Sequence, residues 1–160
     1  MDGQPTLALL AGSVSQPSTV VYAPLSSLLF RPDDIWSPAT QHTWVPVKSA
    51  STVAVDAGYL SLPQAIEFPS AHGRTAHMLY YPPANMDYVA GEGEAPPLLC
   101  KSHGGPTSAT SATFNLSIQY WTSRGWAVAD VNYGGSSGYG RVFRDRLKGA
   151  WGVVSTRAGI

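Results

Sequence analysis

Ser136 stands between two glycines in the pattern Gly134-x-Ser136-x-Gly138, which is the spacing of a nucleophile elbow between a strand and a helix. An esterase of this kind needs an acid and a histidine later in the chain. Only one acid follows, Asp145, and all four histidines precede the serine: His42, His72, His77 and His103. The order fails, so we interpret Ser136 as part of a glycine-permitted loop. Because triads occur in other orders, a self-contained esterase remains an alternative.

A second candidate follows the apolar run Leu98–Ser102, where the chain continues as His103-Gly104-Gly105-Pro106. Two glycines after a strand let the backbone turn so that an N–H points into the cleft above the sheet. Acyl-transfer enzymes use such amides to hold the oxyanion that develops on the attacked carbonyl. From the residues alone, an oxyanion donor and a simple turn at the strand end are both open.

The glycine loop at residues 134–140 does not complete a nucleotide site. Phe143 stands where a dinucleotide fingerprint needs its third glycine, and the Gly-Lys-Ser/Thr ending of a phosphate loop is missing. Cys100 and His103 are two metal candidates where a structural zinc site needs four ligands. We therefore expect no cofactor, and we expect Cys100 to be a buried strand residue.

Other polar residues favour plain structural roles. His72 and His77 lack partners in the sequence and are expected at the surface. The basic residues around Asp145 are interpreted as a solvated helix face: Arg141, Arg144, Arg146 and Lys148.

Strands and helices must position these candidates. Apolar or alternating runs predict strands at Ser18–Ala23, Ser51–Val55, Ile66–Phe68, Arg74–Tyr81, Leu98–Ser102 and Trp126–Asn132. Apolar spacing predicts helices over Phe114–Arg124, ended by Gly125, and over Arg141–Lys148. Strand, loop and helix repeated across residues 98–148 predict an α/β fold with parallel strands.

Composition narrows the class of protein. The 160 residues make one ordinary domain or slightly less, and 10 basic against 10 acidic residues favour neither nucleic acid nor a membrane surface as a partner. One cysteine cannot form an internal disulfide, and no run approaches the roughly 20 apolar residues of a membrane span. The N-terminal apolar run lacks a preceding basic residue and makes a poor signal peptide. We expect a cytoplasmic protein.

Residues Pro96–Gly152 strongly resemble the prolyl oligopeptidase family of serine peptidases, in particular its acylaminoacyl-peptidase and dipeptidyl-aminopeptidase-like branch. Several motifs carry the resemblance in the family's order and spacing: His103-Gly104-Gly105-Pro106, Gln119-Tyr120-Trp121, Arg124-Gly125-Trp126, Val131-Asn132-Tyr133-Gly134-Gly135-Ser136-Ser137-Gly138-Tyr139-Gly140 and Trp151-Gly152. The family joins a β-propeller to an α/β-hydrolase domain. The resemblance thus implies a propeller end at residues 1–60, the N-terminal part of the hydrolase domain at 61–154, and a non-family tail at 155–160.

The resemblance also implies roles for particular residues. In the family the His-Gly-Gly-Pro turn supplies a backbone donor to the oxyanion hole, which falls here on Gly105 or Gly104. The family's nucleophile lies in a later Gly-x-Ser-x-Gly, so the resemblance implies that Ser136 matches the motif but is not the nucleophile.

After Val154 the family continues with an acidic stretch and then the triad, and this chain departs from that pattern. We expect a serine-peptidase fragment that lacks nucleophile, acid and histidine and is inactive alone, with a peptide as substrate of the complete enzyme. The alternative is a non-enzymatic truncated product that binds a partner or self-associates through an open sheet edge.

Overall fold

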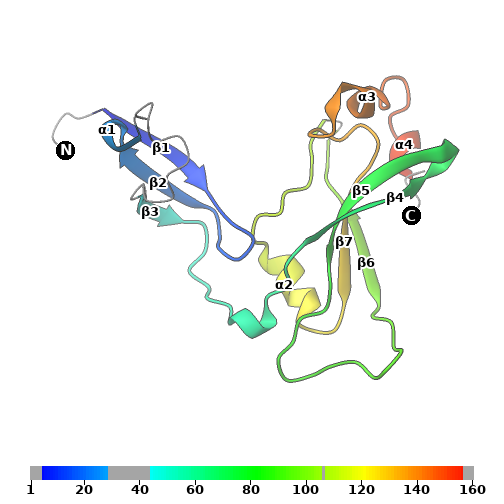
Figure 1. Cartoon of the computed structure of the whole chain (residues 1–160), viewed down its shortest axis with the longest axis horizontal. Helices are drawn as coiled ribbons and strands as arrows, with labels where there is room; N and C mark the ends of the chain where they lie inside the picture. The colour runs from blue at the N-terminus through cyan, green and yellow to red at the C-terminus, as the bar shows by residue number, and fades with distance from the viewer. Residues whose placement is uncertain (1–4, 29–43, 106, 157–160) are drawn as a thin grey trace, which may run out of the picture.

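The computed structural model describes residues 5–28, 44–105 and 107–156, which form two separate β-sheets and short helices. Figure 1 shows the smaller sheet, blue to cyan, standing to one side of the larger one, with helix α2 between them. A backbone hydrogen bond connects the loop after β1 to the segment before α2: the Phe114 amide donates to the Ser13 carbonyl at 2.8 Å. No helix in these ranges has the length and apolarity needed to cross a bilayer.

The smaller sheet is antiparallel with strand order β1-β2-β3. Its strands are β1 (Thr6–Ala11), β2 (Thr19–Pro24) and β3 (Val45–Ser49), and the short helix α1 (Leu25–Leu28) follows β2. Val21 and Ala23 point inward from β2, whereas β1 is exposed over nearly its whole length. This sheet therefore holds only a small core.

The larger sheet carries the candidate site and has strand order β4-β5-β7-β6. Its strands are β4 (Gln64–Ser70), β5 (Arg74–Tyr81), β6 (Leu98–Ser102) and β7 (Ala127–Asn132). The β4–β5 and β5–β7 pairs are antiparallel, and β6 and β7 run parallel. Within the described residues, β6 is an edge strand whose one neighbour is β7.

Every residue of β7 is buried, because both faces of this strand are covered. On one face Val128 packs with Tyr81 and with Ile118 of α2 (Leu116–Thr122). On the other, Ala129 and Val131 pack in a second cluster that includes Tyr133 and Leu147. Alternation along the strand puts Asp130 and Asn132 on the α2 face with Val128.

Polar and glycine signals set the ends of α2. The Asn115 side chain accepts hydrogen bonds from the amides of Ser117 and Ile118 at the N-terminus. Gly125, with φ of +85°, follows the C-terminus as predicted. The other helices among the described residues are the 3-10 turns η2 (Ala57–Tyr59) and η3 (Ala71–Gly73), and α3 (Gly140–Asp145) and α4 (Val153–Thr156).

The prediction of a mixed α/β fold is confirmed, although only one strand pair among the described residues is parallel. The bounds predicted for β5 and β6 match the structure. The strand predicted at Ser51–Val55 is wrong, since that stretch is irregular and the strand lies at Val45–Ser49. A further strand, β1, was not predicted from the sequence.

Candidate functional site

The candidate site lies where β6 and β7 end side by side. Ser102 pairs with Val131 in the parallel register, so the chain leaves both strands at the same edge of the sheet. His103, Gly104 and Gly105 follow β6 immediately, and Tyr133 follows β7. Two loops whose contacting residues lie 33 positions apart in the sequence are thereby brought together.

Gly104 and Gly105 form an open turn at this edge. Both are exposed, and a Cβ built on either would meet no atom within 4 Å. Gly105 has φ of +77°, a backbone conformation that favours glycine. Among the described residues neither amide has a hydrogen-bond partner, so both N–H groups are free to donate to a ligand.

Tyr133 holds the far end of this turn. Its hydroxyl donates to the Gly105 carbonyl at 2.8 Å. Its ring stacks on the His103 ring, with the centroids 4.6 Å apart and the planes 20° apart. Because Tyr133 itself is buried in the core cluster of β7, the glycine turn is tied to the rigid centre of the sheet.

Ser136 is fully buried and bonds to His103, with 2.7 Å between its Oγ and the histidine Nε2. The serine hydroxyl donates to the Tyr133 carbonyl at 2.8 Å, so the hydrogen-bond pattern assigns the histidine Nε2 as the donor to the serine oxygen. The other ring nitrogen, Nδ1, lies 3.3 Å from the Gly104 carbonyl oxygen.

This serine–histidine pair is not arranged as a nucleophile and its base. A general base accepts the serine proton, whereas here that proton is directed at a carbonyl. In the described part of the chain no carboxylate bonds to His103 to orient it. The pair instead links the loop after β6 to the loop after β7.

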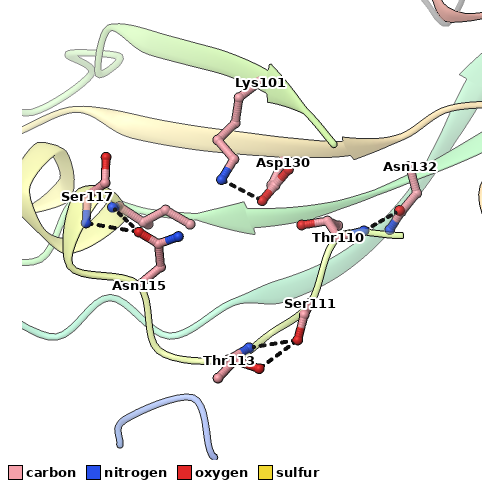
Figure 2. Close-up of polar contacts among 9 residues, drawn as sticks. Lys101, Thr110, Ser111, Thr113, Asn115, Ser117, Asp130 and Asn132 are labelled. Carbon is pink, nitrogen blue, oxygen red and sulfur yellow. Dashed lines mark hydrogen bonds and ion pairs between the residues drawn. The ribbon is translucent and has the colours of Figure 1, made fainter. Parts of the chain in front are cut away.

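Further bonds run along the same two loops. Ser137 donates from Oγ to the Thr107 carbonyl at 2.6 Å and from its amide to the Ser108 carbonyl at 2.9 Å. Figure 2 shows the Thr110 amide directed at the Asn132 side chain, whose Oδ1 accepts at 2.9 Å. The segment that leads from the glycine turn to α2 is thus fixed to the end of β7.

A partly buried ion pair lies behind the turn, between neighbouring positions of the two parallel strands. Lys101 Nζ is 2.9 Å from Asp130 Oδ2, and the lysine side chain is 38% exposed and the aspartate side chain 5%. Figure 2 draws this contact as a dashed line. The other carboxylate oxygen of Asp130 and the hydroxyl of Tyr81 are buried with no hydrogen-bond partner among the described residues. Burial raises the pKa of the Tyr81 phenol above its usual range, and the charge of Asp130 raises it further.

Several residues singled out from the sequence take other positions than expected. Cys100 is exposed, which corrects the prediction of a buried residue, because the face of β6 that carries Leu98, Cys100 and Ser102 is uncovered within the described sheet. His72 is exposed as predicted, but His77 is half-buried and stacks on Tyr139 at 4.0 Å. No group of three or more potential metal ligands occurs among the residues that the structure describes.

Of the four basic residues around Asp145, three lie as predicted and one does not. Arg141, Arg144 and Lys148 are exposed, as expected for a solvated face. Arg146 turns inward, donates to the Thr75 carbonyl at 2.7 Å and lies over the Phe143 ring.

Sequence reasoning missed the link between His103 and Ser136, and the role of Tyr133. The signal that could have found them is that all three residues follow the carboxyl ends of two predicted strands. Adjacent parallel strands end at the same edge, so their following loops meet there.

Comparison with known proteins agrees with the motifs. Residues 112–157 match the family model of the Prolyl oligopeptidase family. An uncharacterized peptidase of Bacillus subtilis, YuxL, is 28% identical over 123 residues, 76% of this chain and 18% of that protein. Dipeptidyl aminopeptidase BIII of Pseudoxanthomonas mexicana is 39% identical over 69 residues, 42% of this chain and 10% of that protein.

Solved structures show the same relationship. A puromycin-hydrolyzing peptidase of Mycobacterium tuberculosis superposes with a TM-score of 0.80 and 35% identity, over 96% of this chain and 21% of that one. The acylaminoacyl peptidase of Pyrococcus horikoshii, at 20% identity and a TM-score of 0.60, shares the fold over 97% of this chain and 22% of its own.

The fold is mixed α/β, and the motifs are similar to those of a peptidase family. The resemblance to the prolyl oligopeptidase family is confirmed, with acylaminoacyl and dipeptidyl peptidases among the similar proteins. The chain spans about a fifth or less of the length of the first relatives it matches.

Proposed function

We propose that this chain supplies the oxyanion-binding element of a serine-peptidase domain and that nucleophile, acid and histidine come from outside its 160 residues. The observation that carries the proposal is the exposed Gly104–Gly105 turn, with two amides that have no partner among the described residues, at the end of β6 in a chain that resembles this peptidase family. The chain alone would then be inactive.

The chemistry requires only the backbone of this chain. When a serine attacks a peptide carbonyl, negative charge develops on the carbonyl oxygen, and an N–H held nearby stabilises it. Gly105 is the preferred donor and Gly104 the second candidate. No metal or cofactor takes part in this proposal.

The wider organisation belongs to the same proposal. Residues 1–60 would be the end of a β-propeller and residues 61–154 the N-terminal part of an α/β-hydrolase domain, while the family match extends to residue 157, into the stretch 155–160 that the motifs alone placed outside the family. The complete enzyme would act on peptides in the cytoplasm, without a nucleic-acid or membrane partner.

Ser136 is not proposed as a nucleophile. Its side chain is fully buried, and its hydroxyl proton is held by the Tyr133 carbonyl. A fluorophosphonate probe should therefore leave the chain unlabelled. Labelling that disappears in Ser136→Ala would restore the self-contained esterase.

A chimera tests the oxyanion proposal. Residues 61–154 of this chain replace the matching segment of the puromycin-hydrolyzing peptidase, whose structure superposes on nearly the whole chain. The chimera should hydrolyse puromycin. Replacing the donating glycine by proline should lower kcat by roughly 10²–10³, the usual cost of one oxyanion donor.

Alanine variants provide the matched controls. Gly105→Ala keeps the N–H and can still adopt the φ of +77° at a cost of about 1–2 kcal/mol, whereas Gly105→Pro removes the N–H and also forces φ to about −65°. Only the proline variant should lose most of its kcat, and Gly104→Ala against Gly104→Pro tests the second donor in the same way. A folded chimera without activity, or proline variants that match their alanine controls, would overturn the proposal.

A second candidate function is self-association at the edge of β6. Within the described sheet this edge strand has an unpaired backbone ladder, and Leu98 on it is 52% exposed. Open apolar edges favour pairing with a further strand. We propose that a second copy of the chain pairs there when no other strand covers it.

Cys100 reports directly on such a pair because it lies at the centre of Leu98–Ser102 and is exposed. In a twofold antiparallel pair centred on it, the two Cys100 Cα atoms would be about 4.5–5.5 Å apart, within the disulfide range of about 4.4–6.8 Å. Mild oxidation should give a disulfide-linked dimer, and Leu98→Lys should suppress both the dimer and its sedimentation. A monomer at all concentrations would exclude this function.

A further inference from the structure

The Gly104–Gly105 turn is held from both sides by neighbouring side chains. On the β6 side, His103 stacks on Tyr133 and bonds through Nε2 to Ser136 Oγ at 2.7 Å. On the far side, the Tyr133 hydroxyl bonds to the Gly105 carbonyl at 2.8 Å. The two glycines therefore span two fixed points.

Contacts at both ends of the turn are important because glycine has the most flexible backbone of all residue types. Two consecutive glycines with open space around them would sample many backbone directions, and their amides would point at a common target only part of the time. An oxyanion donor is effective when it is already oriented before the charge develops. The turn needs an external support, and the loop after β7 provides it.

We propose that Tyr133, His103 and Ser136 are positioning residues that preset the direction of the Gly104 and Gly105 amides. This inference rests on the proposed oxyanion function of the turn. Tyr133 fixes the C-terminal end of the turn through the Gly105 carbonyl. His103 fixes the residue that precedes Gly104, and Ser136 in turn fixes the histidine ring.

The burial of the three residues supports a division of labour. Ser136 is fully buried and Tyr133 nearly so, which makes them a rigid support for the turn. His103 is half-buried and the glycines are exposed, so the buried side chains restrict the backbone of the exposed turn. Each of these two hydroxyls donates one hydrogen bond: that of Tyr133 to the Gly105 carbonyl and that of Ser136 to the Tyr133 carbonyl.

The first test measures the motion of the glycine amides in the whole chain by ¹⁵N relaxation with labelled glycine. Tyr133→Phe removes only the hydroxyl. The order parameters of the Gly104 and Gly105 amides should fall from roughly 0.85, typical of rigid backbone, to below roughly 0.6. In Ser136→Ala the ¹⁵N signal of His103 Nε2 should shift as its acceptor is lost.

Tyr139→Phe is the matched control. It also removes one hydroxyl contact, the bond from Asn132 Nδ2 at 3.0 Å, but that contact does not reach the glycine turn. The glycine order parameters should stay unchanged in this variant. Equal loss of order in both tyrosine variants, or unchanged glycines in Tyr133→Phe, would overturn the proposal.

The second test uses the puromycin-hydrolysing chimera. Tyr133→Phe should lower kcat with KM unchanged, because the amides act on the transition state and not on the bound substrate. Tyr139→Phe should leave both constants unchanged. Loosened glycines with an unaltered kcat would refute the positioning role.

The two tests distinguish failure of the positioning role from failure of the proposed oxyanion function. An inactive chimera would count against the oxyanion function, while glycine order in the whole chain would still decide whether Tyr133 holds the turn. An active chimera that needs neither glycine N–H nor the Tyr133 hydroxyl would refute both.

Discussion

The buried hydroxyl of Tyr81 gives the sharpest prediction about stability. This side chain packs with Ile118 and Val128, and its hydroxyl is buried with no partner among the described residues. A buried polar group without a partner costs about 1–3 kcal/mol. Tyr81→Phe keeps the ring in the cluster and removes that cost, so the free energy of unfolding should rise by about 1 kcal/mol at neutral pH.

The same variant should change the pH dependence of stability. In the folded chain, burial and then the Asp130 charge raise the pKa of Tyr81 above its ordinary value of 10.0. The unfolded chain therefore loses this proton first as the pH rises, and the folded chain binds more protons than the unfolded one. Stability is then lost as the pH rises above the unfolded value, and the phenylalanine variant escapes this loss.

Urea unfolding followed by tryptophan fluorescence measures both effects, at low micromolar concentration to limit pairing at the β6 edge. The advantage of Tyr81→Phe should be present at pH 7 and should widen above about pH 10. Tyr133→Phe is the control with the opposite sign, since its hydroxyl has a partner and its loss should cost about 0.5–1.5 kcal/mol. A Tyr81→Phe variant that is less stable than the parent at every pH would refute the reasoning and would mean that the hydroxyl is satisfied.

Two further predictions concern the strands and turns that position the site. Lys101→Met leaves the buried Asp130 carboxylate unpaired and should cost about 1–2 kcal/mol in urea unfolding, since the lysine is 38% exposed and solvent screens the pair, and adding Asp130→Asn should restore part of it; if the single variant unfolds like the parent, the pair contributes nothing. Gly135→Ala should cost more than about 1 kcal/mol, since φ is +112° and a Cβ would approach Leu147 Cβ to 2.8 Å, whereas Gly104→Ala should be tolerated in open space; equal unfolding midpoints for the two would contradict the described loop.

The larger sheet was the part most accessible from the sequence. Arg74–Tyr81 is followed directly by two prolines, and the apolar run that starts at Leu98 is preceded by two prolines, so both strands had clear limits. The helix α2 had apolar spacing and a glycine stop. These signals are local, and local signals define elements better than they define contacts.

The smaller sheet was harder because its strands break the usual patterns. Strand β3 contains Pro46, which argues against a central strand, but β3 lies at the edge of its sheet where a missing amide is tolerated. The alternating stretch Ser51–Val55 has the stronger strand pattern and stays irregular. Strand β1 is exposed along nearly its whole length, so its apolar run carried no inward and outward alternation to detect.

Cys100 shows how topology decides burial. Its apolar neighbours Leu98 and Leu99 favoured a buried strand, yet Leu98, Cys100 and Ser102 are exposed because no described element covers the face of β6 on which they lie. Composition reports how apolar a strand is, but the elements packed on the two faces of the sheet decide whether its side chains are covered.

The candidate site depended on contacts that no single segment encodes. Chain order was used against Ser136 because every histidine precedes it, yet His103 reaches it at 2.7 Å, since order along the chain does not limit contact between the ends of parallel neighbours. What excludes the serine as a nucleophile is the direction of its proton, toward the Tyr133 carbonyl. The same bond that removes Ser136 from catalysis makes it useful as a support, because a serine that must hold a histidine ring in place cannot also release its proton to that ring.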